Sequence, residues 1–244
     1  MERLLKAIKE SKHLVALTGA GISTLSGVSD FRGKNGLYKQ NSIEADNIFS
    51  LSYFLKDPSY YYLKTKDFIY NVHEKIPCVV HRVLAELERK NILKSVITQN
   101  IDMLHQKAGS RNVIEIHGSP AVHKCLRCAK SFPYDEIRTI LEEGKIPHCP
   151  DCGGIIKPEI IFFGENLNER ALSNAVSEAL KADLMLVLGS TLVVQPAASL
   201  PLYTIKNSGR IVIINNMETP LDDMALLRYS DLEKSFNYLD GCFF

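Results

Sequence analysis

The sequence has almost no excess of charge of either sign. Its 244 residues include 29 Lys and Arg against 28 Asp and Glu, which leaves a formal net charge of +1. Nucleic-acid-binding domains gather Lys and Arg into a basic patch or stripe, and no such stripe stands out here. We therefore expect no direct binding to nucleic acid.

Long apolar runs are missing as well. No stretch approaches the roughly 20 consecutive apolar residues that cross a bilayer. The first residues, MERLLKAIKESKH, mix charged and apolar side chains and lack the uninterrupted apolar centre of a signal peptide. We expect no membrane association and a cytoplasmic location.

No internal repeat or low-complexity segment interrupts the ordinary strand and helix patterns. Helical periodicity is clear in HRVLAELERKN and ERALSNAVSEALKAD. Short runs rich in Val, Ile and Leu alternate with such helices, and the runs are His13–Thr18, Ser95–Gln99, Val113–Ile116, Leu184–Leu188 and Arg210–Ile214. Apolar strands that alternate with helices predict an α/β fold with a Rossmann-like, doubly wound parallel sheet.

Two stretches break this alternation. One is tyrosine-rich and helical in pattern, and the other carries paired cysteines. We expect residues 34–76 to form a helical insertion and residues 122–156 a zinc-ribbon insertion, which together make a small domain. The larger, Rossmann-like domain then comprises residues 1–33, 77–121 and 157–244. The sequence does not define the oligomeric state.

Four of the six cysteines have the spacing of a metal site. Cys125-x2-Cys128 and Cys149-x2-Cys152 are separated by twenty residues, as in the paired knuckles of a four-thiolate zinc site. Four thiolates close the coordination sphere, so the zinc would be structural and not catalytic. A redox pair would leave the second Cys-x2-Cys unexplained.

A glycine-rich stretch, LTGAGISTLSGVSDFRG, follows the first apolar run. Its Gly19-Ala20-Gly21 fits the first strand-to-helix turn of a dinucleotide-binding fold, where backbone N–H groups reach a pyrophosphate. The third glycine of the usual fingerprint is absent, because Thr24 stands at that position. A plain glycine-rich turn is the alternative.

Polar residues gather where the expected strands end. Asp30-Phe31-Arg32 lies beyond the glycine turn, Gln99-Asn100-Ile101-Asp102 ends the second run, and His117 follows the third. Ligands of open α/β sheets bind at the carboxyl ends of the strands, so these groups are candidates for one site.

Together these motifs resemble those of sirtuins, the NAD-dependent protein-lysine deacylases. The segments GAGIST, SDFRG, TQNIDMLH, IEIHGS, the four-cysteine pattern, KPEIIFFGE, LGSTLVVQPAASLP and INNMETP occur in the family's order. The resemblance covers nearly the whole chain and is closest to compact bacterial-type sirtuins.

The resemblance implies roles for individual residues. His117 would be the general base, and Asn100 would share the catalytic role. NAD would be bound by Gly19, Ala20, Gly21, Thr24, Asp30, Phe31, Arg32, Gln99, Asn100, Ile101, Asp102, Gly189, Ser190, Thr191 and Asn215. An extended acyl-lysine peptide would bind along Ile161, Phe163, Gly164, Glu165 and Val193.

The implied reaction converts acetyl-lysine and NAD into lysine, nicotinamide and O-acetyl-ADP-ribose. A mono-ADP-ribosyltransferase that uses the same pocket, or a deacylase for longer neutral acyl groups, is the alternative. A non-catalytic NAD-sensing module would not require His117 or Asn100. Sirtuins that remove succinyl groups carry Tyr-x-x-Arg. In DPSYYYLKTKDF, Tyr62 aligns with that Tyr and Thr65 with the Arg, and a one-residue shift offers Tyr61-x-x-Lys64, whose lysine lacks the two-donor fit of Arg. We therefore expect neutral acyl groups to be preferred.

Overall fold

The computed structural model describes residues 1–28 and 46–243 and contains a six-stranded sheet. The strand order is β3-β2-β1-β7-β8-β9, and every pairing is parallel. The strands are β1 Leu14–Thr18, β2 Leu93–Thr98, β3 Val113–Glu115, β7 Leu184–Leu188, β8 Arg210–Ile214 and β9 Leu227–Tyr229. The five predicted apolar runs are β1, β2, β3, β7 and β8, so the predicted fold class is confirmed.

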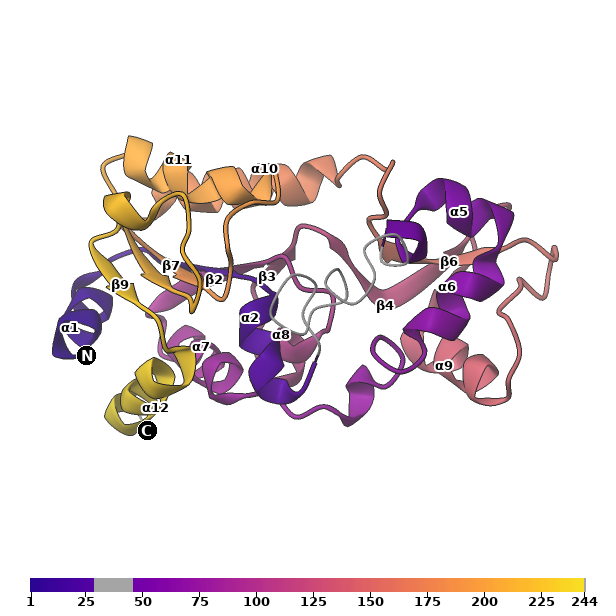
Figure 1. Cartoon of the computed structure of the whole chain (residues 1–244), viewed down its shortest axis with the longest axis horizontal. Helices are drawn as coiled ribbons and strands as arrows, with labels where there is room; N and C mark the ends of the chain where they lie inside the picture. Colours follow the sequence, from indigo (N-terminus) through magenta and orange to yellow (C-terminus); the bar gives the residue numbers. More distant parts are fainter. Residues whose placement is uncertain (29–45, 244) are drawn as a thin grey trace.

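Helices cover both faces of this sheet (Figure 1). Alternate residues of β1 belong to different cores: Leu14 and Ala16 pack on one face, Val15 and Leu17 on the other. The first core includes residues of α1 (Glu2–Glu10), α7 (Val79–Arg89) and α12 (Leu232–Phe243), and the second includes residues of α10 (Glu169–Lys181) and α11 (Leu200–Lys206). Burial on both faces explains why these strands are apolar at nearly every position.

The direction of winding reverses between β1 and β7. Strands β2 and β3 lie on one side of β1, whereas β8 and β9 lie beyond β7. The turn after β1 forms α2 (Ala20–Ser23) and η1 (Thr24–Ser26), the segment after β2 leads to α8 (Leu104–Lys107), and η3 (Ala197–Ser199) and η4 (Asp222–Met224) follow β7 and β8. In open α/β sheets this reversal opens a crevice for ligands at the carboxyl ends of the strands.

A second sheet lies at one end of the molecule, on the right in Figure 1. It is antiparallel, in the order β5-β4-β6, with β4 Gly118–Cys125, β5 Ser131–Pro133 and β6 Ile156–Ile160. One buried cluster joins this sheet to residues of α5 (Leu51–Lys56), α6 (Pro58–Thr65), η2 (Val72–Glu74) and α9 (Tyr134–Glu142). Residues of both predicted insertions thus share a core, and β6 continues past the expected boundary at residue 156.

Three histidines are buried in these cores. His81 and His123 are 0% exposed and His105 is 1% exposed. Burial lowers the pKa of His81 to about 4, and lowers the pKa values of His105 and His123 to about 3, with smaller contributions from His81 and Lys157 respectively. All three are therefore neutral in the folded protein at pH 7.

Acidification should destabilise the fold through these residues. Below a pH of about 6.5 the unfolded chain binds protons that the folded chain excludes, so stability falls as the pH falls towards the folded pKa values. For His123 alone, the loss between pH 7.0 and 5.5 should be about 1 kcal/mol. Urea unfolding of the wild type and of His123→Gln, with equal zinc present, measures it. An equal loss in both proteins would contradict this assignment, because glutamine does not titrate.

Candidate functional site

A cleft of about 910 Å³ lies at the carboxyl ends of β1, β2, β7 and β8. Most of the site residues expected from the sequence line it: Gly19, Ala20, Gly21, Thr24, Gln99, Asn100, Ile101, His117, Ile161, Phe163, Gly189, Ser190, Thr191 and Asn215. Asp102 lines a small cavity of about 30 Å³ that shares Ala20, Asn100 and Ile101 with the cleft. Gly164, Glu165 and Val193 line neither space. Asp30, Phe31 and Arg32 lie outside the described residues.

The floor of the cleft is a close crossing of two turns. The N–H of Gly19 donates to the carbonyl of Leu188, and that of Gly21 donates to the carbonyl of Gly189, both at 2.9 Å. A Cβ atom on Gly21 would lie 2.8 Å from the Cα of Gly189. Gly189 itself has φ +61°, and its Cβ would lie 2.6 Å from the nitrogen of Ile22. The close contact between the two turns therefore requires glycine at both positions.

His117 lies where the two sheets meet, after β3 and directly before β4. Its Nδ1 is 2.9 Å from the backbone carbonyl oxygen of Gln99. Because a carbonyl can only accept, Nδ1 carries the proton and Nε2 keeps its lone pair. Burial lowers the pKa of His117, and the bond to Gln99 opposes this in part. A neutral imidazole that lines the cleft is suited to accept a proton.

Asn100 is held by the turn that follows β1. Its Nδ2 donates to the carbonyl oxygen of Gly19 and to Oγ of Ser23, both at 3.1 Å. Ser23 in turn donates to the Asp102 carboxylate at 2.5 Å, and the N–H of Leu104 donates to the other carboxylate oxygen at 2.9 Å. Burial raises the pKa of Asp102. The network fixes the Asn100 side chain at the base of the cleft.

Gln99 links the ends of β2 and β7 across the same floor. Its Nε2 donates to Oγ of Ser190 at 2.9 Å, and this oxygen also accepts the N–H of Leu192 at 3.3 Å. Leu192 has φ +54°, and Met103, after the Asn100 segment, has φ +57°. Left-handed backbone at non-glycine residues is uncommon and often accompanies functional sites. Both loops are thus held in specific conformations around the cleft.

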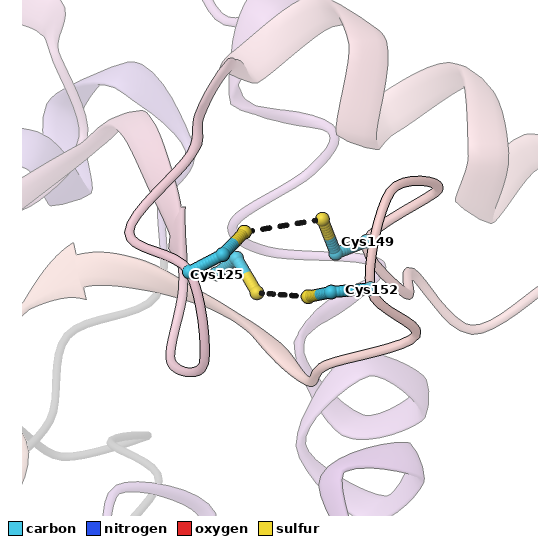
Figure 2. A group of neighbouring side chains, drawn as sticks. Cys125, Cys149 and Cys152 are labelled. Carbon is cyan, nitrogen blue, oxygen red and sulfur yellow. Dashed lines mark hydrogen bonds between the residues drawn. The ribbon is translucent and has the colours of Figure 1, made fainter.

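The four expected zinc ligands converge in the small domain. The sulfur atoms of Cys125, Cys128, Cys149 and Cys152 all lie within 4.8 Å of one another. The sulfurs of Cys125 and Cys152 are 3.4 Å apart and those of Cys128 and Cys149 are 3.6 Å apart (Figure 2). A tetrahedral ion with Zn–S bonds of about 2.3 Å needs sulfurs about 3.8 Å apart. The cluster therefore fits zinc.

The backbone around the cysteine cluster favours thiolates that lie close together. The N–H of Arg127 donates to the sulfur of Cys125 at 3.4 Å, which stabilises a thiolate there. A Cβ atom on Gly154 would lie 2.7 Å from the same sulfur, so glycine allows the sulfurs to approach. Two sets of observations, the cleft and the cysteine cluster, now agree with the motifs in the sequence.

The sequence model that describes the Sir2 protein family matches residues 19–196 of this chain. The chain belongs to the Sir2 family. It is 46% identical to an NAD-dependent protein deacetylase of Thermotoga maritima over 94% of this chain and 92% of that protein. It is 44% identical to NAD-dependent protein deacylase 1 of Archaeoglobus fulgidus, over 92% and 89% respectively. A solved structure of Sir2 with p53 peptide and NAD+ superimposes with a TM-score of 0.90 at 43% identity, covering 99% of this chain and 97% of that one.

Some residues that line the cleft of this Sir2-family chain were not predicted from the sequence. They include Leu25, Phe49, Ile160, Val194, Asn216, Met217, Ser230, Asp231, Leu232 and Glu233. The stretch 230–233 follows β9, which has only three residues. Had that strand been predicted, the rule that ligands bind at strand ends would have pointed to these residues.

Lys and Arg are absent from the described lining of the cleft. Its formally charged members are Asp231 and Glu233. The tyrosines that could correspond to an acyl-reading residue, Tyr61 and Tyr62, are 1% and 0% exposed in the small-domain core. The hydroxyl of Tyr62 donates to the carbonyl of Ile156 at 2.7 Å. These tyrosines therefore have a packing role in this structure.

Replacing one cluster cysteine should remove the metal and loosen the small domain. Cys149→Ala leaves three ligands, and a structural zinc site contributes directly to folding free energy. We expect metal analysis to fall from one zinc per chain to none, with a lower melting temperature. Cys242→Ala is the matched control, because Cys242 is exposed and outside the cluster. Full zinc content in Cys149→Ala would contradict the site.

Proposed function

We propose that the chain removes acetyl groups from protein lysines with NAD as co-substrate, and that His117 is the general base. Relatives that share most of its length are named NAD-dependent protein deacetylases or deacylases. The observation that carries the role of His117 is its hydrogen bond to Gln99, which places the proton on Nδ1 and leaves Nε2 basic. The lowered pKa keeps this nitrogen unprotonated at neutral pH.

The residues at the strand ends fit an NAD molecule. The turns at Gly19–Thr24 and Gly189–Thr191 would face its phosphates, with Asn215 at the adenosine ribose. Gln99, Asn100, Ile101 and Asp102 would surround the nicotinamide end, where the small cavity adjoins the cleft. NAD supplies a ribose carbon that accepts the acyl oxygen as nicotinamide leaves. His117 would then take a proton from a ribose hydroxyl, and Asn100, fixed by Gly19 and Ser23, would orient the ribose.

The substrate peptide would bind beside His117 as an added strand. Ile161 and Phe163 line the cleft, and the Phe163 side chain is 55% exposed. Val193, in the loop after β7, is 50% exposed, and its neighbour Val194 lines the same cleft. Exposed apolar side chains on two backbone segments beside one cleft suit an extended peptide, which is recognised mainly through its main chain. Gly164 and Glu165 would shape the end of this segment.

Zinc would be held by the four cysteines and would have a structural role, because four thiolates leave no open coordination position. None of the six cysteines forms a disulfide bond, which favours a reducing compartment such as the cytoplasm. None of the described helices is long and apolar enough to cross a membrane. We keep the expected division into residues 1–33, 77–121 and 157–244 and an inserted small domain as a proposal.

One experiment separates this function from its alternatives. The protein is mixed with NAD and an acetyl-lysine peptide, and the products are identified by mass spectrometry. A deacetylase gives nicotinamide, the peptide with an unmodified lysine, and O-acetyl-ADP-ribose in equal amounts. A mono-ADP-ribosyltransferase gives nicotinamide and an ADP-ribosylated protein while the peptide keeps its acetyl group. A binding module gives neither.

His117→Ala should reduce turnover by about a hundred- to ten-thousand-fold, because a positioned general base contributes that much to the rate. NAD binding, measured by calorimetry, should largely survive. The control is His13→Gln. His13 lies directly before β1, at the amino ends of the strands and away from the cleft, and its Nε2 is 2.9 Å from a carboxylate oxygen of Glu178. Turnover of His117→Ala within a few-fold of wild type would place the base elsewhere.

Neutral acyl-lysines should be better substrates than acidic ones. A buried carboxylate needs a cation to offset its lost hydration, and the described lining of the cleft has no Lys or Arg. Butyryl-lysine and succinyl-lysine both have four-carbon acyl chains and differ at the terminal group, so they separate the effect of the carboxylate from that of chain length. We expect kcat/KM on one peptide to be highest for acetyl and at least about tenfold lower for succinyl than for butyryl. Equal values would mean that Lys64, or another cation outside this lining, reads the carboxylate.

A further inference from the structure

Lys157 is a buried lysine close to the cleft but outside its lining. It is 6% exposed, in β6. Burying an ammonium group is unfavourable unless hydrogen-bond acceptors and an opposite charge replace its water. Burial lowers the pKa of Lys157, and Glu165 opposes that effect. A lysine in such an unfavourable position indicates a specific role for its ammonium group.

Among the described residues, the direct partners of the Lys157 ammonium group all belong to the segment that follows it. Its Nζ donates to the carbonyl oxygens of Pro158 at 3.1 Å and Ile160 at 2.7 Å. It lies 2.8 Å from a carboxylate oxygen of Glu165 and 4.2 Å from the ring centre of Phe162. The ammonium group therefore lies inside a loop formed by residues 158–165.

Glu165 closes this loop from the other end. The carboxylate oxygen that faces Lys157 also accepts the N–H of Phe162 at 2.7 Å. The N–H of Glu165 donates back to the carbonyl of Phe162 at 3.0 Å. Gly164, between them, has φ +97°, which only glycine adopts readily. The ion pair thus fixes the turn at the end of the segment.

The enclosed segment forms backbone hydrogen bonds both to His117 and to residues 49–51. The N–H of Ile161 donates to the carbonyl of His117 at 2.9 Å. The N–H of Phe163 donates to the carbonyl of Phe49 at 2.7 Å, and the N–H of Leu51 donates to the carbonyl of Phe163 at 3.1 Å. A shift of this segment would therefore move the peptide-binding side chains and the backbone of His117 together.

We propose that Lys157 and Glu165 are a positioning pair that holds residues 160–163 in the conformation that receives the acyl-lysine peptide. The proposal rests on the deacetylase function above. Neither side chain lines the cleft. The pair acts through the backbone of Ile161 and Phe163, so it affects the peptide site more than the NAD site, which is built on the turns after β1 and β7.

Steady-state kinetics of three variants test the proposal. Glu165→Gln keeps the size of the side chain and removes its charge, and Lys157→Met removes the cation. Both should raise KM for an acetyl-lysine peptide by about tenfold or more while KM for NAD stays within about twofold. Lys157→Arg keeps the charge and should stay closer to the wild type than Lys157→Met. Anisotropy with a labelled acetyl-lysine peptide measures its binding independently of turnover.

The strand carries its own control. Lys124 and Glu159 form an ion pair at 2.8 Å between β4 and β6, but both side chains are about half exposed. Glu159→Gln should leave both KM values unchanged, because exposed pairs contribute little. Zinc content and melting temperature verify folding, and if Lys157→Met fails to fold, the near-isosteric Glu165→Gln decides. An unchanged peptide KM in folded Glu165→Gln, or equal changes for peptide and NAD, would overturn the proposal. An inactive wild type would instead refute the deacetylase function.

Discussion

The contact on which the site depends is the crossing of two turns at the centre of the sheet. Gly19 and Gly21 follow β1, Gly189 follows β7, and their backbones approach so closely that a Cβ atom on any of them would overlap the other turn. The amide groups of Gly19 and Gly21 bind the carbonyls of Leu188 and Gly189 and lock the turns together. Because β1 and β7 are the strands between which the winding reverses, this contact sets the floor of the cleft.

Hydrogen bonds then extend this floor to the other strand ends. Asn100 reaches the carbonyl of Gly19, Gln99 reaches Ser190, and His117 donates to the carbonyl of Gln99. Each bond joins residues that follow different strands of the sheet and lie at least 18 positions apart in the sequence. The basicity of His117 follows from the same geometry, since burial keeps its ring neutral and the Gln99 carbonyl decides which nitrogen carries the proton. The chemistry of the site therefore depends on sheet order as much as on residue identity.

The sequence predicts the parts of this arrangement that are strongly patterned. Strands buried on both faces appear as unbroken apolar runs, and paired cysteines at fixed spacing indicate their own cluster. Short elements that mix polar and apolar residues are not predicted. β9 is Leu-Arg-Tyr, and because this strand was missed, so were residues 230–233, which follow it and line the cleft. Side-chain direction escapes too. The motif predicts Glu165 beside the peptide but does not predict that its carboxylate binds Lys157 and the N–H of Phe162.

The two sheets differ in how much apolar surface they bury, which explains where the polar stabilisation lies. The large sheet has helices on both faces. The small sheet has three strands and shares one aromatic cluster with short helices, including Phe54, Tyr61 and Phe162. Small modules with limited cores commonly require a metal or another covalent or ionic constraint. Here the cysteine cluster closes one end of the β4–β6 pair, and the Lys157–Glu165 pair constrains the segment that leaves the other end. Because His117 directly precedes β4 and bonds to the segment after β6, the stability of the small sheet and the position of the base are physically linked.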